Sequence, residues 1–173
     1  MMNRTELAKS IFDTAYLTGE FLLRSGKISN EYFDKYQFES KPELLEEIAI
    51  NLATMIDIDF DYLAPLEMGG IPIATALSMK INKPMIFVRK KAKEYGTQKF
   101  AEGPSIKGKK LLIVEDVVTS GGQIIISVNQ LREEGAVIDT SICVIDRESG
   151  GKEALQKEGI KLIPLYTMTE LKN

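Results

Sequence analysis

The chain has 173 residues, of which 44% are hydrophobic and 27% charged, and its formal net charge at pH 7 is −3. This composition is typical of a globular protein, and it argues against a disordered chain, a fibrous repeat and a strongly basic nucleic-acid-binding surface. The sequence has no histidine and one cysteine, Cys143, which excludes histidine-dependent catalysis, disulfides within the chain and multi-cysteine metal sites.

The elements predicted from hydrophobic periodicity alternate between helices and strands. A helix over 4–18 comes first, followed by a turn and a short extended hairpin within 19–40. The later pattern predicts helical segments over 42–56, 69–80, 121–135 and 150–159, and strands over 62–66, 83–90, 109–116, 137–147 and 160–167. This alternation predicts an α/β fold with a mainly parallel central sheet flanked by helices, formed as one domain over residues 1–173. Ligands of such sheets bind at the carboxyl ends of the strands.

No segment approaches the roughly 18 apolar residues of a membrane helix. The start, MMNRTELAKSIF, lacks the apolar core of a secretory signal. We therefore expect a cytoplasmic protein with no membrane partner, and a single cysteine fits a reducing compartment.

The segment that follows the apolar run LLIV carries acidic and small hydroxyl residues. Glu115 and Asp116 end a buried strand, where adjacent carboxylates are costly unless cations or hydroxyl groups meet them. Thr119 and Ser120 precede two glycines at a helix start, where exposed backbone N–H groups form an anion site. The pattern offers a phosphate cradle beside carboxylates, which suit ribose hydroxyls or the waters of a bound magnesium ion. The plainer interpretation is an ordinary strand–turn–helix with capping hydroxyl groups.

The run LIVEDVVTSGG resembles the phosphoribosyl pyrophosphate (PRPP) signature of the type I phosphoribosyltransferases. In that family the two acids face the ribose hydroxyls and the TSGG turn holds the 5′-phosphate. The resemblance implies that Asp116 is catalytic. It also implies PRPP contacts from Glu115, Asp116, Val117, Val118, Thr119, Ser120, Gly121, Gly122 and Gln123. The glycine and lysine spacing of 103–109 is near that of a nucleotide P-loop, but this segment precedes a strand, so we expect a turn there.

Positive charge is concentrated in residues 80–110, which hold ten Lys and Arg, two Glu and no Asp. The densest part, RKKAK, falls at the end of a predicted strand. Such a focus suits a multiply charged anion, since each charge-assisted contact contributes roughly 1.5–3 kcal/mol, although a charge run is usually a solvated face. Nucleic acid is the alternative anion, but no aromatic platform or recognition helix accompanies these residues.

The run VRKKAKEYGTQKFAEG resembles the mobile catalytic loop of the orotate phosphoribosyltransferases, which here covers 90–104. In that family the loop closes over the active site of the partner subunit in a dimer. The resemblance implies a homodimer in which Lys90 and Lys93 reach the partner's site. Arg89, Lys90, Lys93 and Tyr95 would contact PRPP, with Lys93 catalytic on the leaving pyrophosphate. Tyr95 stands where many members have His. The resemblance also implies that Mg²⁺ is held mainly through PRPP, with no direct protein ligand.

The run CVIDRESGG ends an apolar strand with Asp146 and Arg147. From the residues alone, this pair indicates a surface ion pair. In orotate phosphoribosyltransferases the matching arginine binds the orotate carboxylate, which a guanidinium holds through two hydrogen bonds. The resemblance therefore assigns Arg147 to orotate and places Thr119 near the same ring.

Residues 1–40 are expected to form a small N-terminal hood over the base, because FLLRSGKISNEYFD resembles the N-terminal segment of the same family. Arg24 is expected to contact orotate, and Tyr32 and Phe33 match aromatic positions near the ring. A packed hairpin explains these two residues equally well. The run GGIPIAT matches the turn that approaches pyrophosphate through its backbone, but this chain has Gly69 where some members have a lysine.

The implied reaction is transfer of the 5-phosphoribosyl group from PRPP to orotate, giving orotidine 5′-monophosphate and diphosphate in de novo UMP synthesis, with Mg²⁺ as cofactor. A purine phosphoribosyltransferase would use the same PRPP signature, but Arg147 and the RKKAK segment favour orotate. The second alternative is a PRPP-binding regulatory protein without turnover. Such regulators usually carry an added DNA-binding domain, for which 173 residues leave no room, so we expect no nucleic-acid partner.

Overall fold

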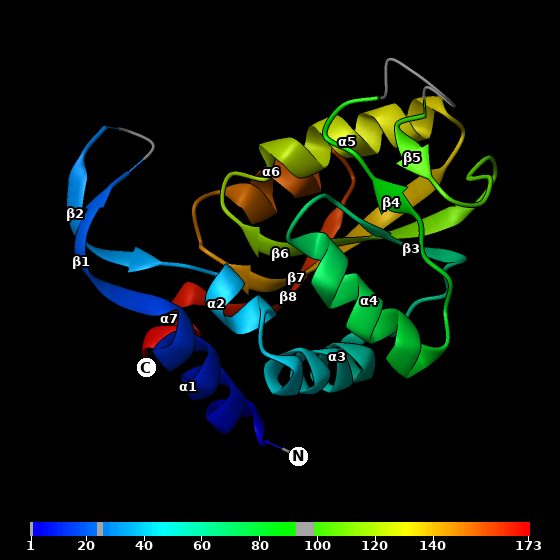
Figure 1. Cartoon of the computed structure of the whole chain (residues 1–173). Helices are drawn as coiled ribbons and strands as arrows, with labels where there is room; N and C mark the ends of the chain where they lie inside the picture. The colour runs from blue at the N-terminus through cyan, green and yellow to red at the C-terminus, as the bar shows by residue number, and fades with distance from the viewer. Residues whose placement is uncertain (1, 24–25, 93–98) are drawn as a thin grey trace.

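The computed structural model describes residues 2–23, 26–92 and 99–173 (Figure 1). The elements are, in chain order, α1 (Arg4–Ala15), β1 (Tyr16–Leu22), β2 (Ile28–Phe33), α2 (Tyr36–Glu39), α3 (Pro42–Met55), β3 (Tyr62–Pro65), α4 (Gly70–Ile81), β4 (Phe87–Val88), β5 (Ala101–Glu102), β6 (Lys110–Val118), α5 (Gly122–Glu133), β7 (Val137–Asp146), α6 (Gly151–Lys157), β8 (Lys161–Thr167) and α7 (Met168–Lys172). Within these ranges, no helix has the length and apolarity needed to cross a membrane.

Four parallel strands form the central sheet, in the spatial order β3–β6–β7–β8. Helices cover both faces of the sheet: α5 and α6 lie on one side, and α1, α3, α4 and α7 on the other (Figure 1). Successive side chains of β6 therefore enter two different cores. Leu112 and Val114 belong to the core under α1, α3 and α4, and Leu111 and Ile113 to the core under α5 and α6. Burial on both faces explains the continuous apolar run, and it confirms the predicted α/β class.

The order of connections reverses between β3 and β6. After β3, α4 leads to residues 85–88, which extend the sheet beyond β3 through the bridges Leu63–Met85 and Leu66–Val88. After β6, α5 leads to β7 on the opposite side. The carboxyl ends of β3 and β6 consequently lie side by side at a topological switch point, which is where open α/β sheets bind their ligands.

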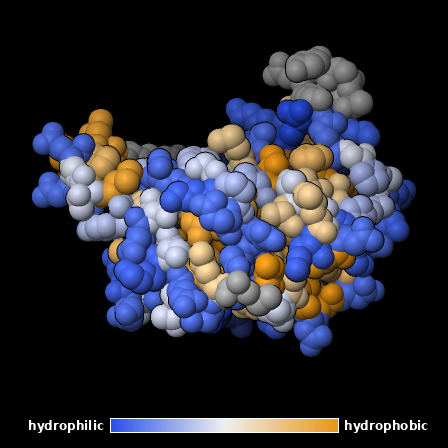
Figure 2. Space-filling view, turned by 60° about the horizontal axis from the view of Figure 1, so that its bottom comes forward, coloured by the Kyte–Doolittle hydropathy of each residue, from blue (hydrophilic) through white to orange (hydrophobic). Residues whose placement is uncertain are grey.

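The hood contains the antiparallel hairpin β1–β2, which projects from the body of the molecule (Figure 1). Phe21 and Tyr32 stack across this hairpin with ring centroids 5.5 Å apart. Leu22 and Ile28, near its tip, are 76% and 65% exposed, and Figure 2 shows apolar side chains on the projection at the left. The chain then returns to the body through α2, which Phe38 anchors in the core.

Several predicted boundaries are wrong. The first helix ends at Ala15, because Tyr16 turns to extended backbone and pairs with Phe33 in the hairpin. Only residues 87–88 of the predicted strand 83–90 form a regular strand, which pairs with β5, while the contacts of this segment with the β3 edge are isolated bridges. The helices α2 and α7 and the strand β5 were not predicted: each has five residues or fewer, too few to show a period.

Candidate active site

The loop that joins β6 to α5 encloses a cavity of about 270 Å³, lined by Glu115 and residues 117–124. Thr119 and Ser120 are exposed at this loop. Gly121 precedes α5 with φ of 75°, a left-handed conformation that glycine adopts without steric cost. Gly121, the N-cap residue of α5, has no side chain that could cap the helix, so the N–H groups of the first turn are available to an anion.

Glycines allow the turns around this cavity to approach one another. A Cβ on Gly151, at the start of α6, would lie 2.4 Å from the carbonyl oxygen of Thr119. A Cβ on Gly70, at the start of α4, would lie 2.3 Å from the carbonyl oxygen of Val114. The turns after β3, β6 and β7 are therefore packed backbone against backbone at the carboxyl end of the sheet.

The carboxyl groups of Glu115 and Asp116 differ in environment and charge. Asp116 is fully buried; its Oδ1 accepts the N–H of Val117 at 2.6 Å, and its Oδ2 forms an ion pair with Lys35. Burial acts to raise the pKa of Asp116, but hydrogen bonds from Glu115 and Lys35 outweigh it and hold that pKa below its ordinary value. Burial, followed by the contact with Asp116, raises the pKa of Glu115 well above its usual range. Asp116 is thus the member of the pair that ionises first, and Glu115 holds its proton more tightly.

Lys35, which sequence reasoning missed, provides the cation beside Asp116. It comes from the residue that precedes α2, and its side chain is 32% exposed. Gly69 lies against Asp116 Oδ2, and a Cβ at this position would be 1.5 Å from that oxygen. The position where some family members have a lysine is therefore filled here by the Asp116 carboxylate. The spacing of Lys35 and Glu39 in FDKYQFE places both on one helix face, but it gives no indication that this face meets Asp116.

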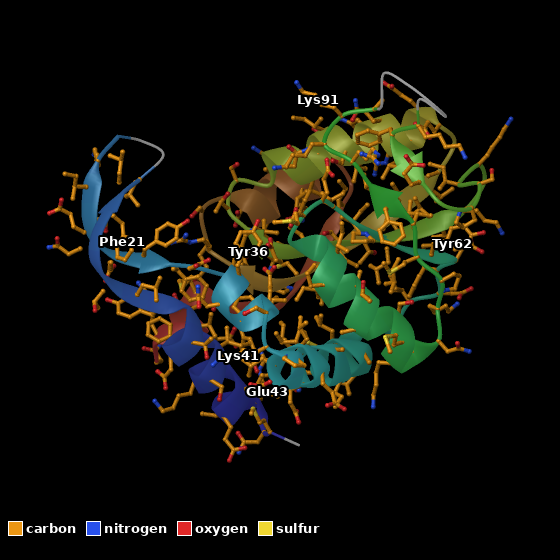
Figure 3. The ribbon with its side chains drawn as sticks, viewed as in Figure 1. Phe21, Tyr36, Lys41, Glu43, Tyr62 and Lys91 are labelled. Carbon is orange, nitrogen blue, oxygen red and sulfur yellow. The ribbon has the colours of Figure 1, made fainter. Side chains whose placement is uncertain are left out.

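The basic segment 89–92 begins beside the turn that follows β3. The backbone N–H of Lys90 donates to Glu67 Oε1 at 2.6 Å, and the Lys90 side chain is exposed. Arg89, predicted to hold PRPP, has its Nε 3.2 Å from Glu102 Oε1, so it pairs across the base of the loop. Figure 3 shows Lys91 at the top of the molecule, Phe21 on the projecting hairpin at the left, and Tyr36 near the centre. Lys93 and Tyr95, the other predicted PRPP residues of the loop, lie outside the described residues.

Arg147 lines a second cavity, of about 320 Å³, together with residues of the hood. The lining comprises Phe12, Tyr16, Leu23, Ser29, Glu31, Tyr32, Phe33, Arg147, Met168 and Lys172. The fold thus brings Arg147 to the two aromatic residues predicted near the base. Lys172 and Tyr16 also line this space and were missed, because only the docking of α7 and of the hairpin places them there. Arg24, predicted to contact orotate, falls in the undescribed part of the hood.

The predicted surface ion pair between Asp146 and Arg147 is wrong. Asp146 is buried and its Oδ1 accepts the N–H of Glu148 at 2.9 Å, so it shapes the turn instead. The Glu148 carboxylate accepts the N–H and O–H of Thr169 at 2.9 and 2.6 Å, which ties the turn to α7. Over the ranges that the structure describes, the Arg147 guanidinium has no ion-pair or hydrogen-bond partner and is exposed to the cavity.

Thr119 and Arg147, both predicted to hold orotate, line different cavities. Thr119 belongs to the cavity of the β6–α5 loop, and Arg147 to that of the hood. The two loops are nevertheless joined, because the N–H of Arg147 donates to the carbonyl of Val118 at 2.9 Å. Both cavities therefore lie at the carboxyl ends of β6 and β7.

Comparison with known proteins identifies the family. A family model of the phosphoribosyl transferase domain matches residues 37–166. The orotate phosphoribosyltransferase of Nocardioides sp. is 44% identical over 165 residues, which cover 95% of this chain and 92% of that protein. That of Methanocaldococcus jannaschii is 44% identical over 155 residues, covering 90% and 88%.

A solved structure supports the same relationship. The Mycobacterium tuberculosis H37Rv orotate phosphoribosyltransferase in complex with inorganic phosphate aligns with a TM-score of 0.86 and 25% identity, over 98% of each chain. Identities above 40% across nearly the whole length, together with the domain match, show that this chain belongs to the orotate phosphoribosyltransferase family.

Proposed function

We propose that this protein transfers the 5-phosphoribosyl group of PRPP to orotate, giving orotidine 5′-monophosphate and diphosphate for UMP synthesis in the cytoplasm. Residues 1–173 would act as one phosphoribosyltransferase domain. Family membership supports the reaction. The observation that carries it in the structure is the cavity at the start of α5, with uncapped N–H groups, beside the buried Asp116 carboxylate at the switch point.

PRPP would bind across the carboxyl ends of β3 and β6. The 5′-phosphate would accept hydrogen bonds from the loop 119–123 and the first turn of α5. The ribose hydroxyls would face Glu115 and Asp116, and the diphosphate would lie toward the turn 67–70 and the basic segment that starts at Arg89. This placement puts each charged part of PRPP against groups of complementary charge or donor character.

Catalysis would come from stabilising charge that develops as the bond between C1 and the diphosphate breaks. The ribose ring becomes positively charged, and Asp116 is the ionised carboxylate beside it. The diphosphate becomes a more negative leaving group, and Arg89, Lys90 and Lys93 are assigned to it. No covalent nucleophile takes part, because the base nitrogen itself attacks the ribose.

Mg²⁺ is assigned as the cofactor, and it would neutralise the diphosphate when bound. Both Asp116 oxygens are engaged, by the Val117 N–H and by Lys35, which leaves the partly exposed Glu115 as the acid able to meet waters of the ion. A single acid that meets only the waters of the ion fits Mg²⁺ held mainly through the oxygens of PRPP.

Orotate would bind where the β7 turn meets the hood. Its carboxylate suits the unpaired Arg147 guanidinium, and its ring suits the aromatic wall formed by Tyr32 and Phe33. Two further residues are assigned to orotate: Thr119, from the loop after β6, and Arg24.

A homodimer, with Lys90 and Lys93 reaching the partner's site, is part of the proposal. An apolar groove of about 620 Å³ lies between α3 and α4, and Met79 at its edge is 82% exposed. Figure 2 shows apolar patches among polar side chains over this part of the surface. Glu46 of α3 and Lys80 of α4 line the two walls of the groove. A two-fold axis can therefore place Glu46 of one copy against Lys80 of the other, and the reverse.

The decisive experiment follows orotate absorbance with PRPP and Mg²⁺ present, and again with PRPP omitted. PRPP-dependent loss of orotate is the expected result. Consumption of PRPP with a purine base but not with orotate would contradict the substrate assignment. PRPP binding without turnover of any base would instead favour a regulatory protein.

A further inference from the structure

The short helix α2 at the base of the hood brings two charged residues to Asp116 that have no role in the reaction described above. Lys35 precedes the helix and Glu39 ends it, so they lie one turn apart and face the same way. The Lys35 ammonium forms an ion pair with Asp116 Oδ2, and Asp116 is the residue that, after burial, does most to raise the pKa of Glu39. Glu39 is only 5% exposed, an unusual place for an acidic residue.

The Glu39 carboxyl is buried and is influenced by a second carboxyl, that of Asp116. Neither Glu39 oxygen has a hydrogen-bond partner among the residues that the structure describes. Two neighbouring buried carboxylates would repel each other, which favours the protonated form of one of them. Burial and the contact with Asp116 raise the pKa of Glu39 to about 9. Of the two acids, Glu39 is therefore the one that holds its proton.

The Asp116 carboxylate is consequently fixed from several directions. Val117 N–H holds Oδ1 and Lys35 holds Oδ2, and a protonated Glu39 can offer Asp116 a further donor from α2. Gly69 leaves room for Oδ2, because a Cβ at this position would lie 1.5 Å from that oxygen. The helix itself is anchored, because Phe38, between the two charged residues, is fully buried in the core. A rotation of Asp116 would break at least one of these contacts.

We propose that Lys35 and Glu39 are positioning residues that hold the Asp116 carboxylate in the orientation needed to bind PRPP. Lys35 does so as a cation and Glu39 as a neutral hydrogen-bond donor. The proposal rests on the proposed function, in which Asp116 meets the ribose of PRPP. It assigns a part of PRPP binding to the base of the hood, outside the loops at the strand ends.

The test compares Glu39→Gln with Glu39→Met, two variants of similar length and volume. Gln keeps a donor for Asp116, whereas Met fills the same space without one. We expect the Met variant to raise KM for PRPP about tenfold or more, as expected for one lost charge-assisted hydrogen bond. The Gln variant should stay within about threefold of the original protein, a spread typical of such contacts. KM for orotate should change little in both.

Lys35→Met provides an independent arm that does not depend on how position 39 packs, because the Lys35 side chain is partly exposed. It should raise KM for PRPP by a similar factor, and Lys35→Arg should restore it. Lys41→Met and Glu43→Met are matched controls, since both residues are exposed and lie where α2 joins α3 (Figure 3). They should leave both KM values unchanged.

Three outcomes would overturn the proposal. Equal KM values for PRPP in the Gln and Met variants would show that Glu39 only fills space. An unchanged KM in Lys35→Met would remove the lysine from PRPP binding. A loss of orotate affinity equal to the loss of PRPP affinity would indicate general damage to the site. Failure of the proposed function is a separate result, because the unmodified protein would then show no PRPP-dependent loss of orotate.

Discussion

Gly69 and Asp116, from the turns after neighbouring strands, compete for the same space. A Cβ on Gly69 would lie 1.5 Å from Oδ2 and 2.3 Å from Cγ of Asp116, both closer than any real contact. The Asp116 side chain cannot move aside without cost, because it is fully buried and forms an ion pair with Lys35. The missing side chain at position 69 is therefore a condition for the carboxylate to stand at the switch point.

Gly69→Ala should consequently displace Asp116 and weaken PRPP binding. We expect kcat/KM for PRPP to fall by about tenfold or more and stability to fall by about 1–3 kcal/mol, the usual cost of overpacking. Gly159→Ala is the control, since φ is +70° there but a Cβ meets open space. That control should lose about 1 kcal/mol of stability, the cost of a left-handed alanine, while keeping KM for PRPP. Steady-state kinetics and urea unfolding measure both; an unchanged kcat/KM in Gly69→Ala would contradict the argument.

The loop after β6 could be predicted from sequence because its features are local. A buried strand, two acids, two hydroxyl residues and two glycines occupy one continuous stretch, and the structure places them around one cavity. The cluster around Asp116 could not be predicted, because Lys35 and Glu39 reach it from a four-residue helix far away in the sequence. The position of Arg147 in a cavity with Tyr32 likewise depends on how the hairpin docks.

Other errors had a readable signal. Thr167 and Glu170 form a capping box, a pattern of Thr followed three residues later by Glu that marks the start of α7. By contrast, the hydrogen bond from the Glu148 N–H to Asp146, which replaces the expected ion pair, follows from the backbone of one turn. Adjacent opposite charges in a sequence give no indication of that geometry.

Arg147→Gln should weaken orotate binding with little effect on PRPP. The guanidinium is exposed to the hood cavity and has no ion-pair partner in the described part of the chain, so its removal leaves no unpaired carboxylate behind. We expect KM for orotate to rise about tenfold or more, because a bidentate charge-assisted contact is lost. Arg147→Lys should restore only part of the orotate affinity, since an ammonium group lacks the planar fork of the guanidinium. Lys152→Gln, an exposed change in the following helix, is the control; equal KM values for orotate in all four proteins would exclude Arg147 from the orotate site.

Stability should fall as the pH rises toward 9, and Glu39 should account for part of the loss. The pKa of Glu39 is raised from an ordinary 4.5 to about 9, chiefly by burial and then by Asp116. Between these values the folded state holds a proton that the unfolded state has released, so the free energy of unfolding decreases with pH. The contribution is fully present below about pH 4.5 and is lost through pH 9.

The groups that face Glu39 are Asp116, Lys35 and Asp34, and Glu115, whose pKa is also raised, contributes separately. Glu39→Gln cannot release that proton, so its unfolding free energy should decline less between pH 6 and pH 9 than that of the original protein. Urea unfolding at a series of pH values measures the difference between the two curves. Parallel curves would show that Glu39 is ionised in the folded state.

The groove between α3 and α4 should be the dimer interface. Met79→Glu places a charge at the edge of the apolar groove, where burial against a second copy would be costly. Light scattering after gel filtration should give the mass of a monomer for this variant and twice that mass for the original protein. Val137→Glu is the control, because Val137 is an exposed apolar residue at the first position of β7 and does not line the groove. A dimer that survives Met79→Glu would move the interface elsewhere.

Activity should follow assembly if the basic loop completes the partner's site. Met79→Glu should then lose kcat while remaining folded, because Lys90 and Lys93 would have no neighbouring site to reach. Mixing two inactive variants, Lys93→Ala and Asp116→Asn, tests this directly. A mixed dimer holds one site with an intact aspartate on one chain and an intact loop lysine from the other, so mixing should restore activity. A loop that served its own chain would give mixed dimers in which both sites lack one group, and the mixture would stay inactive.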